Sequence, residues 1–432
     1  MLKVLPIVVA IVVCFSSVGF MKFSGTPTGS SVKVINAKAA PVNDAQIFPD
    51  ATENTVHGVS EELVAREQNI LRLCWEIIPN AVKYEITVEG AAFVTYTNGI
   101  EIPVRDVNSA YHIRAIALNG TTISEKISVK TAEANPTMPL TTTEFDKMDY
   151  PPLYPVYSWI PVAGADHYEV ELIKDGTIVR RYFTQIQPQD DDFDFYDKRP
   201  VLDEGEYFWR VRGLNQSNQP LTLWSMREPS NSFTVKHRIR FCAFGDSITH
   251  GGGSISVPPS TVVYNWETYC AIPIKNLGRS GDTTSELLDR FESDVLPFRP
   301  EILFIMAGVN DYRGDIPSWE SVDNLAYLRD KCRYYGIRPV FITPTPLNPP
   351  QINTVGFLEP VPSDWQERQR IICDWIRRQE DFIDVNDKLT DAEGNLSPSL
   401  SVDGLHPDAE GKRIIGEAVT AWLDRYMNLR QS

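Results

Sequence analysis

Short sequence motifs for metal and nucleotide sites are missing from this chain. The six cysteines form no Cys-x-x-Cys pair, which argues against a zinc ribbon and a thioredoxin-type redox site. The six histidines are scattered and include no His-Glu-x-x-His pair, so they imply no metal ion. Residues 251–253 are glycines, but no Gly-Lys-Ser or Gly-Lys-Thr occurs there, which disfavours a nucleotide-binding loop. We therefore expect neither a cofactor nor a metal.

Positive charge is also in short supply. The chain has 41 Lys and Arg against 57 Asp and Glu, a net charge of −16 over 432 residues, so we do not expect it to bind nucleic acid. Eight of the acids fall within residues 190–206, which we expect to form a solvated acidic loop, since no EF-hand spacing is present for calcium. Hydrophobic residues (42%) and charged residues (23%) are typical of a folded chain, whose length suggests about three domains.

Long apolar runs are limited to one, at residues 5–21 between Lys3 and Lys22. A basic start and an apolar run are typical of a secretory signal, and this run is also nearly long enough to span a bilayer. We expect residues 1–25 to be a signal peptide or an N-terminal membrane anchor, and the protein to be exported and either secreted or anchored at the cell envelope. Residues 26–59, rich in Ser, Thr, Pro and Asn, are expected to be a linker.

Two later segments repeat one pattern. Trp75 and Tyr84 are nine residues apart in CWEIIPNAVKYEITV, and Trp159 and Tyr168 have the same separation in SWIPVAGADHYEVEL. Downstream, YHIRAIALN parallels YFWRVRGLN. Apolar and polar residues alternate in these segments, which is the period of a half-buried strand. Each copy therefore predicts a small antiparallel β-sandwich.

Each copy resembles a fibronectin type III domain, through the early Trp and the later Tyr-x-x-Arg strand. The resemblance covers residues 60–135 and 150–236, and it implies two all-β, immunoglobulin-like sandwiches. Units of this kind serve as spacers or as modules that bind glycans or proteins, so contact with a glycan or the cell envelope stays open.

From residue 238 onward, strand and helix patterns alternate. Short apolar runs predict strands at residues 238–244, 302–308 and 338–344, and a weaker one at 271–274. Helical patterns occupy residues 283–296, 318–335, 363–379 and 408–427. This alternation predicts a parallel sheet with helices on both faces, in which the site lies at the carboxyl ends of the strands.

Polar motifs follow the predicted strands directly. Ser247 stands in Gly-Asp-Ser-Ile-Thr after the first run, Gly281 follows the weak run, and Asn310 follows the next run. Near the C-terminus, Asp403 precedes His406 by three residues. A serine on a turn after a strand, with a histidine that a carboxylate orients, can perform acyl transfer. The Gly-x-Ser-x-Gly elbow of another hydrolase class is not formed, because position 249 is Thr.

These blocks resemble those of the SGNH hydrolases, also called GDSL-type lipases and esterases. The resemblance covers residues 238–432 and implies a three-layer, flavodoxin-like α/β domain with a parallel sheet. It implies that Ser247 is the nucleophile, that His406 is the general base and that Asp403 is the carboxylate that orients His406.

The same resemblance implies an oxyanion hole. Its donors are the backbone N–H groups of Ser247 and Gly281 and the side-chain amide of Asn310. A glycine at position 281 lets the backbone approach the substrate closely. Ile248 stands where the GDSL name has Leu, and it keeps that position apolar.

Three functions stay open. Export and the β-sandwich units favour a serine esterase that removes short acyl groups, most simply acetyl, from carbohydrate. A lipid or lysophospholipid acylhydrolase is the first alternative, although the sequence shows no apolar lid or long apolar groove. The second is a glycan-binding or adhesive surface protein with an inactive hydrolase domain, against which the intact residue set argues.

Nearby residues carry weaker predictions. His250 and the glycines after it are expected to form a flexible edge of the pocket. Four aromatic residues could line a sugar or acyl site, but we expect most of them to pack inside: Trp266, Tyr312, Trp319 and Trp365.

Overall fold

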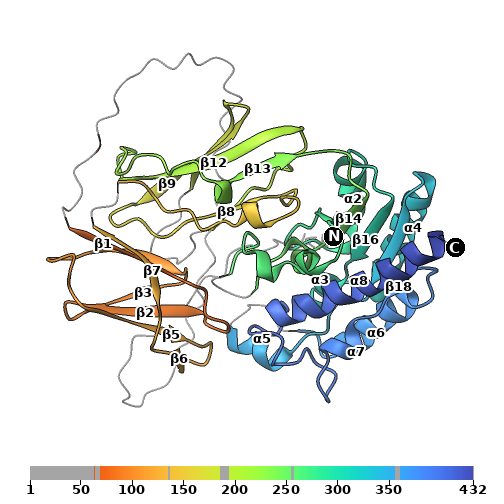
Figure 1. The fold of residues 1–432 in the computed structure, drawn as a ribbon. Helices are drawn as coiled ribbons and strands as arrows, with labels where there is room; N and C mark the ends of the chain where they lie inside the picture. Colours follow the sequence, from red (N-terminus) through yellow and green to blue (C-terminus); the bar gives the residue numbers. More distant parts are fainter. Residues whose placement is uncertain are drawn as a thin grey trace, which may run out of the picture.

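The structure is a computed structural model of the chain. It describes Leu63 and residues 69–134, 137–184, 194–253, 257–355 and 361–431, which form three regions in chain order (Figure 1). The expected signal peptide or anchor, residues 1–25, and the expected linker, residues 26–59, lie outside the described residues. Among the residues that are described, no helix combines the length and apolar character that a membrane crossing needs.

The first region consists of two antiparallel sheets. One has the strand order β4 (Gly99–Pro103), β1 (Ile70–Trp75) and β7 (Val129–Ala134). The other has the order β3 (Ala91–Thr95), β2 (Lys83–Val88), β5 (Tyr111–Ile116) and β6 (Thr122–Ser124). Leu73 of β1 and Ile86 of β2 lie in one apolar core, so the two sheets share it. The assignment to the immunoglobulin-like class stays a prediction.

The second region is also antiparallel. Its larger sheet has the order β10 (Thr177–Thr184), β9 (His167–Lys174), β12 (Gly205–Leu214) and β13 (Ser232–Val235). A smaller sheet pairs β11 (Asp194–Tyr196) with β8 (Val156–Ser158). Trp209 of β12 and Tyr157 of β8 belong to one apolar core, which joins the two sheets.

The sequence repeat corresponds to a repeated side-chain arrangement. The ring centroids of Trp75 and Tyr84 are 5.0 Å apart with an interplanar angle of 64°, and those of Trp159 and Tyr168 are 5.0 Å apart at 61°. In each copy the tyrosine hydroxyl accepts a hydrogen bond from the backbone N–H six residues earlier, at 2.9 and 3.0 Å. The nine-residue spacing therefore builds the same buried edge-to-face pair twice.

The acidic segment is not a solvated loop throughout. Residues 185–193 lie outside the described residues, but Asp197 is buried and accepts hydrogen bonds from Arg180 Nη1 at 2.7 Å and from the Tyr182 hydroxyl at 2.6 Å. Phe195 packs against the core of the second region. The expectation of a solvated loop is therefore wrong around β11, where a carboxylate is buried because a guanidinium pairs with it.

The third region contains a five-stranded parallel sheet. Its order is β15 (Lys275–Asn276), β14 (Phe241–Gly245), β16 (Ile302–Met306), β17 (Arg338–Ile342) and β18 (Phe382–Ile383). This is the 2-1-3-4-5 order of flavodoxin-like sheets. The three stronger apolar runs form strands as predicted. The weak run 271–274 does not form a strand. The strand is β15, the two residues that directly follow this run.

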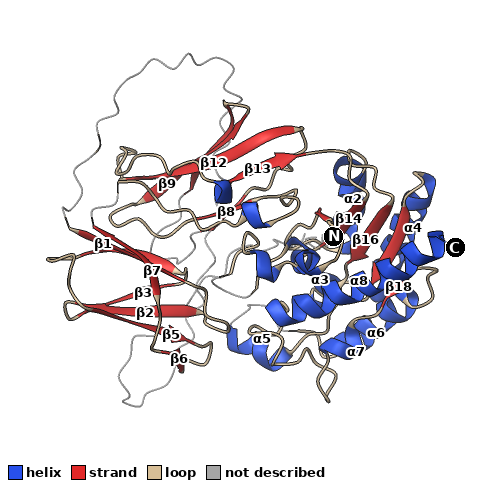
Figure 2. Ribbon diagram, viewed as in Figure 1, coloured by secondary structure: helices blue, strands red, loops and turns tan. Residues whose placement is uncertain are grey.

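Helices cover both faces of this sheet (Figure 1, Figure 2). Phe341 of β17 lies 5.2 Å from Trp375, measured between ring centroids, and Phe304 of β16 lies 5.8 Å from Trp422. Phe304 pairs with Val340, the neighbour of Phe341, so the two phenylalanines point to opposite faces. The helices involved are α6 (Trp365–Ile376), which follows α2 (Thr284–Val295) and α4 (Ser318–Tyr334) along one face, and α8 (Ala409–Gln431) on the other.

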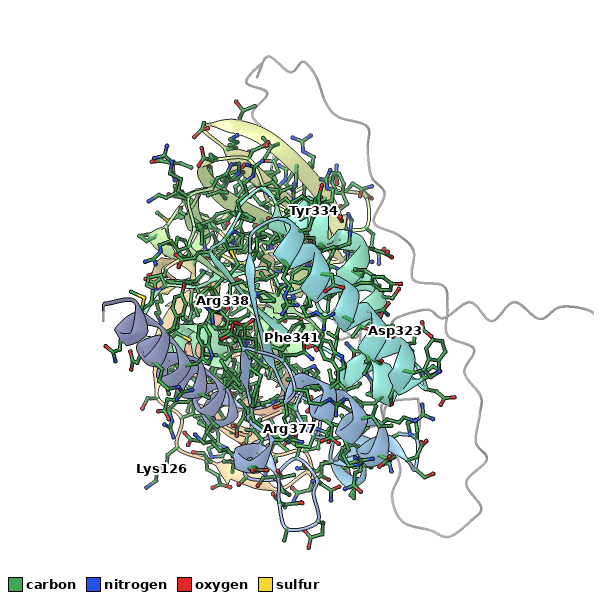
Figure 3. All side chains as sticks on the ribbon, turned by 90° about the vertical axis from the view of Figure 1, so that its right-hand side faces the viewer. Lys126, Asp323, Tyr334, Arg338, Phe341 and Arg377 are labelled. Carbon is green, nitrogen blue, oxygen red and sulfur yellow. The ribbon has the colours of Figure 1, made fainter. Side chains whose placement is uncertain are left out.

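These four helices confirm the helical patterns to within a few residues at each end. Figure 3 looks onto this region from the side, where Tyr334 ends α4 and Arg338 begins β17. Four short helices were not predicted, because each is too brief for a periodic pattern: α1 (Ser247–His250), α3 (Val309–Arg313), α5 (Pro349–Val355) and α7 (Asn386–Leu389).

Candidate active site

Ser247 lies on the tight turn that leaves strand β14. The strand ends at Gly245, where a Cβ would collide with the carbonyl oxygen of Met306 in the neighbouring strand, so only glycine fits. Asp246 caps the helix that follows, because its Oδ1 accepts a hydrogen bond from the N–H of Ile248 at 2.9 Å. Ser247 begins α1 and is half-buried, at the carboxyl end of the sheet.

Ser247, His406 and Asp403 form one chain of hydrogen bonds. Ser247 Oγ lies 3.0 Å from His406 Nε2, and His406 Nδ1 lies 2.8 Å from Asp403 Oδ2. A carboxylate can only accept, so the neutral imidazole carries its proton on Nδ1, and Nε2 accepts from the serine hydroxyl. The Asp403 side chain is 2% exposed and that of His406 is 19% exposed, so the chain runs from a buried carboxylate towards solvent.

The turn around Asp403 fixes its carboxylate. Oδ1 accepts the backbone N–H groups of Leu405 and His406, each at 2.8 Å, and the Ser401 hydroxyl at 3.3 Å. Burial alone would raise the pKa of Asp403. The neighbouring His406 and these backbone hydrogen bonds outweigh burial, so the pKa of Asp403 lies below its usual value. The carboxylate is therefore ionised near neutral pH and can stabilise positive charge on His406.

Gly281 and Asn310 lie on the two adjoining strand-end loops. Gly281 has φ +89°, a conformation that favours glycine, and a Cβ there would meet no protein atom within 4 Å. Asn310, on α3, donates from Nδ2 to the carbonyl oxygen of Asp282 at 2.8 Å, which ties the two loops together. Within the described part of the chain, the backbone N–H groups of Ser247 and Gly281 have no hydrogen-bond partner.

Sequence reasoning missed Arg290 of α2, which holds these loops from within the fold. Its buried guanidinium donates from Nη2 to the carbonyl oxygen of Gly245 at 3.0 Å and from Nη1 to that of Leu277 at 2.8 Å. Two buried carboxylates neutralise it, Asp282 at 2.5 Å from Nε and Asp294 at 2.9 Å from Nη1. Arg290 thus connects the ends of β14 and β15. Its place in an ordinary helical pattern gives no signal of this role.

A second buried cation was also missed. Lys412 of α8 donates from Nζ to the carbonyl oxygen of Ile248 at 2.6 Å, directly beneath the turn that carries Ser247. Burial lowers the pKa of Lys412 and raises that of Glu267, and it raises the pKa of Asp246 to about 7. The ammonium group of Lys412 therefore lies near the carboxyl groups of Glu267 and Asp246, whose ionised forms are destabilised by burial.

His250 is buried, so the expectation that it forms a flexible pocket edge is wrong. Its Nε2 lies 2.6 Å from the carbonyl oxygen of Tyr154, and its Nδ1 lies 2.9 Å from Ser280 Oγ. A carbonyl only accepts, so Nε2 carries the proton and Nδ1 accepts from the Ser280 hydroxyl.

Most of the aromatic candidates pack inside, as expected. Trp266, Tyr312 and Trp365 are buried, whereas Trp319 is 66% exposed. Among the described residues, no group of three or more His, Cys, Asp and Glu side chains could hold a metal ion.

Comparison with known proteins bears on the third region. The model of the GDSL-like Lipase/Acylhydrolase family matches residues 243–414. The Uncharacterized lipoprotein YqeF of Bacillus subtilis (strain 168) is 34% identical over 82 residues, which is 18% of this chain and 34% of that protein. The N-acylneuraminate cytidylyltransferase of Escherichia coli O18:K1:H7 (strain RS218 / NMEC) is 28% identical over 155 residues, or 33% of each chain. The chain thus spans about a third of the length of the curated relatives it matches.

Solved structures include similar proteins. The lipase/acylhydrolase from Enterococcus faecalis is 23% identical, with a TM-score of 0.36, over 42% of this chain and 94% of that one. The family match covers the parallel sheet and the strand-end loops that carry Ser247, Gly281 and Asn310. Residues 243–414 are therefore similar to the GDSL-like lipases and acylhydrolases, a family of ester-hydrolysing enzymes.

Proposed function

We propose that the protein is an exported serine esterase that removes short acyl groups, acetyl foremost, from carbohydrate. The observation that carries the esterase mechanism is the chain of hydrogen bonds from Ser247 through His406 to Asp403. Its distances are those of a nucleophile, a general base and an orienting carboxylate.

In this mechanism Ser247 Oγ attacks the ester carbonyl carbon while His406 Nε2 takes the hydroxyl proton. Asp403 stabilises the imidazolium that forms. His406 then gives its proton to the leaving alcohol, and the acyl group stays on Ser247. Water attacks this acyl-enzyme in the same way, with His406 again as the base, and the free acid leaves.

The oxyanion of each tetrahedral intermediate is bound by the N–H groups of Ser247 and Gly281 and by Asn310 Nδ2. Two observations support this assignment. The backbone amides of Ser247 and Gly281 have no other acceptor among the described residues. Asn310 Nδ2 carries two hydrogens, and the carbonyl of Asp282 takes one of them.

A short acyl group and a polar substrate fit the surface around these residues. No large hydrophobic side chain is exposed in residues 245–253, 276–284, 306–316 or 401–408. A long acyl chain needs an apolar surface to leave water, at about 0.8 kcal/mol per methylene. The segments that bear the candidate residues offer no such surface.

The test is hydrolysis of p-nitrophenyl acetate, butyrate, octanoate and palmitate by the protein and by Ser247→Ala. We expect turnover to be highest on acetate, to fall with chain length, and to vanish in Ser247→Ala. Ser225→Ala is the matched control, because the Ser225 hydroxyl accepts a hydrogen bond from Val211 in the second region, away from the site. Release of acetate from an acetylated polysaccharide would then test the carbohydrate part.

Two other results would each overturn a different part. A maximum at octanoate or palmitate would indicate a lipid acylhydrolase. Absence of Ser247-dependent hydrolysis, with no labelling of Ser247 by a fluorophosphonate, would indicate an inactive domain and a binding function.

Export is proposed from the apolar run at residues 5–21 behind a basic start. Protease treatment of intact cells should degrade the protein, while a cytoplasmic marker protein survives. Protection equal to that of the marker would overturn export.

A further inference from the structure

A five-residue segment directly before strand β8 of the second region lies along the edge of the hydrolase sheet. We call residues Pro151–Pro155 the strap. The N–H of Leu153 donates to the carbonyl oxygen of Asn276 in edge strand β15 at 2.9 Å, and Lys275 Nζ donates to the carbonyl oxygen of Pro151 at 2.6 Å. On its other side, Leu153 accepts from the N–H of Val201 at 2.9 Å. The strap therefore joins the second region to the sheet.

Tyr154 is the strap residue that reaches deepest into the hydrolase region. It is buried in the same apolar core as strands β14 and β16. Its carbonyl oxygen accepts from His250 Nε2 at 2.6 Å, and its hydroxyl donates to Asp294 Oδ2 at 2.7 Å. Both partners belong to the structure that supports the site.

His250 links Tyr154 to both catalytic loops. It is the last residue of α1, the helix that Ser247 begins. Its Nδ1 accepts from the hydroxyl of Ser280, the residue directly before Gly281. A single buried ring thus spans the nucleophile turn and the loop of the proposed oxyanion donor, and its orientation is set by the Tyr154 carbonyl.

Asp294 gives Tyr154 a second connection. The same Asp294 Oδ2 accepts from Arg290 Nη1 at 2.9 Å, and Arg290 Nη2 holds the carbonyl oxygen of Gly245 at 3.0 Å. The guanidinium carbon of Arg290 also lies 5.7 Å from the centroid of the Tyr154 ring, within the range of a cation–π contact.

We propose that Tyr154 and His250 are positioning residues of the esterase. The strap fixes the turn that bears Ser247 and the loop that bears Gly281, so the hydrolase site is complete only with a residue from outside the family-matched segment. The proposal rests on the proposed function, because it takes Ser247 as the nucleophile and Gly281 as an oxyanion donor.

The first test compares two Tyr-to-Phe changes in the full chain. Tyr154→Phe removes the hydroxyl from Asp294 and frees Arg290 to shift. Tyr182→Phe is the matched control, because its hydroxyl donates to a buried aspartate at 2.6 Å but lies wholly within the second region. Small misplacements remote from the reacting atoms can cost up to about 100-fold in rate. We expect kcat on p-nitrophenyl acetate to fall about tenfold in Tyr154→Phe with KM unchanged, and to stay within about twofold of the wild type in Tyr182→Phe.

The second test is a double-mutant cycle on His250 and Ser280. His250→Gln keeps an N–H that can reach the Tyr154 carbonyl but removes the ring Nδ1 that accepts from Ser280, and Ser280→Ala removes the hydroxyl that donates to it. Each single change should lower kcat several-fold. The kcat of the double variant should be no lower than that of His250→Gln, because both changes break the same hydrogen bond between residues 280 and 250.

Equal kcat in Tyr154→Phe and Tyr182→Phe would overturn the positioning role, provided that the wild type hydrolyses ester and reacts with a fluorophosphonate at Ser247. Under the same condition, effects of His250→Gln and Ser280→Ala on kcat that multiply would also overturn it. A wild-type protein that does neither would overturn the proposed function, and the positioning role with it. The wild-type label therefore separates the two failures.

Discussion

Ser247 and His406 are separated by 159 residues in the chain, yet Ser247 Oγ lies 3.0 Å from His406 Nε2. The turn after β14 and the loop before α8 meet at one end of the parallel sheet, and Asp403 holds the ring in place from the buried side. The His406 imidazole depends on the Asp403 carboxylate for its tautomer. The hydrogen bond between Ser247 and His406 is therefore sensitive to a substitution of Asp403 that keeps the shape of its side chain.

Asp403→Asn should leave the fold intact and lower kcat by about 10³–10⁴, with little change in KM. A carboxamide can donate to Nδ1, which places the imidazole proton on Nε2, where it can no longer accept from Ser247. Steady-state kinetics on p-nitrophenyl acetate measures this. Asp381→Asn is the control, because Asp381 pairs with the exposed Arg338 and should change kcat little. A loss of less than tenfold in Asp403→Asn would contradict the assigned role.

Asn310→Ala should lower kcat by about 10²–10³, because one oxyanion donor is lost. The variant should stay folded, since the side chain is half-buried and makes one hydrogen bond, to the carbonyl of Asp282. Asn98→Ala removes a comparable amide-to-carbonyl bond, to Trp75 at 2.9 Å in the first region, and should keep wild-type kcat. Equal kcat in the wild type and Asn310→Ala would remove Asn310 from the oxyanion hole.

Lys412→Met should lower the free energy of unfolding by about 2 kcal/mol. The change leaves the carbonyl of Ile248 without its donor and leaves Asp246 and Glu267 without a nearby cation. Urea denaturation measures the loss. Lys331→Met breaks an exposed pair with Glu292 and should cost less than about 0.5 kcal/mol. Equal losses in the two variants would show that the buried lysine contributes no more than a surface one.

His250 should make the protein less stable as pH drops from about 6.5 to about 4, while Asp246, whose pKa burial raises to about 7, acts in the opposite sense. Burial, followed by the charges of Arg290, Lys412 and Arg279, lowers the pKa of His250 from 6.5 to about 4. In that window the unfolded chain binds a proton at residue 250 that the folded protein does not, so acid favours unfolding, by up to about 3 kcal/mol from this group.

The comparison of His250→Gln with the wild type isolates that contribution. The variant should lose less stability between pH 6.5 and pH 4 in urea titrations, because it has no ring to protonate. His112→Gln is the control, since His112 is exposed on β5, and it should retain the wild-type slope. A wild-type slope in His250→Gln would show that the ring does not cause the acid sensitivity.

Much of the catalytic region could be predicted from the sequence, because its long elements carry clear periods. The apolar runs of β14, β16 and β17 and the patterns of the four long helices all corresponded to structure. The edge strands β15 and β18 did not, since each has two residues and their pairing is decided by neighbours. For the site, the rule that ligands meet strand carboxyl ends was enough to bring together Ser247, Gly281 and Asn310.

The supporting residues could not be predicted, because their roles depend on burial. Arg290 and Lys412 lie in helical patterns where a basic residue normally faces water, and only the packed fold shows their guanidinium and ammonium groups inside. For His250 the prediction was wrong. The glycines after it suggested a flexible edge of the pocket, whereas its ring is buried. Tyr154 lies 91 residues before Gly245, where the first catalytic motif begins, and nothing local marks it as part of the site.

The strap also has a consequence for how the chain is made. An exposed edge strand offers unpaired backbone groups to other chains, and β15 is such an edge of the hydrolase sheet. The backbone bond from Leu153 to Asn276 covers it with residues that precede the sheet in the chain. Since synthesis runs from the N-terminus, the cover leaves the ribosome before the strand that needs it. The order of the regions thus limits edge-to-edge association of newly made chains.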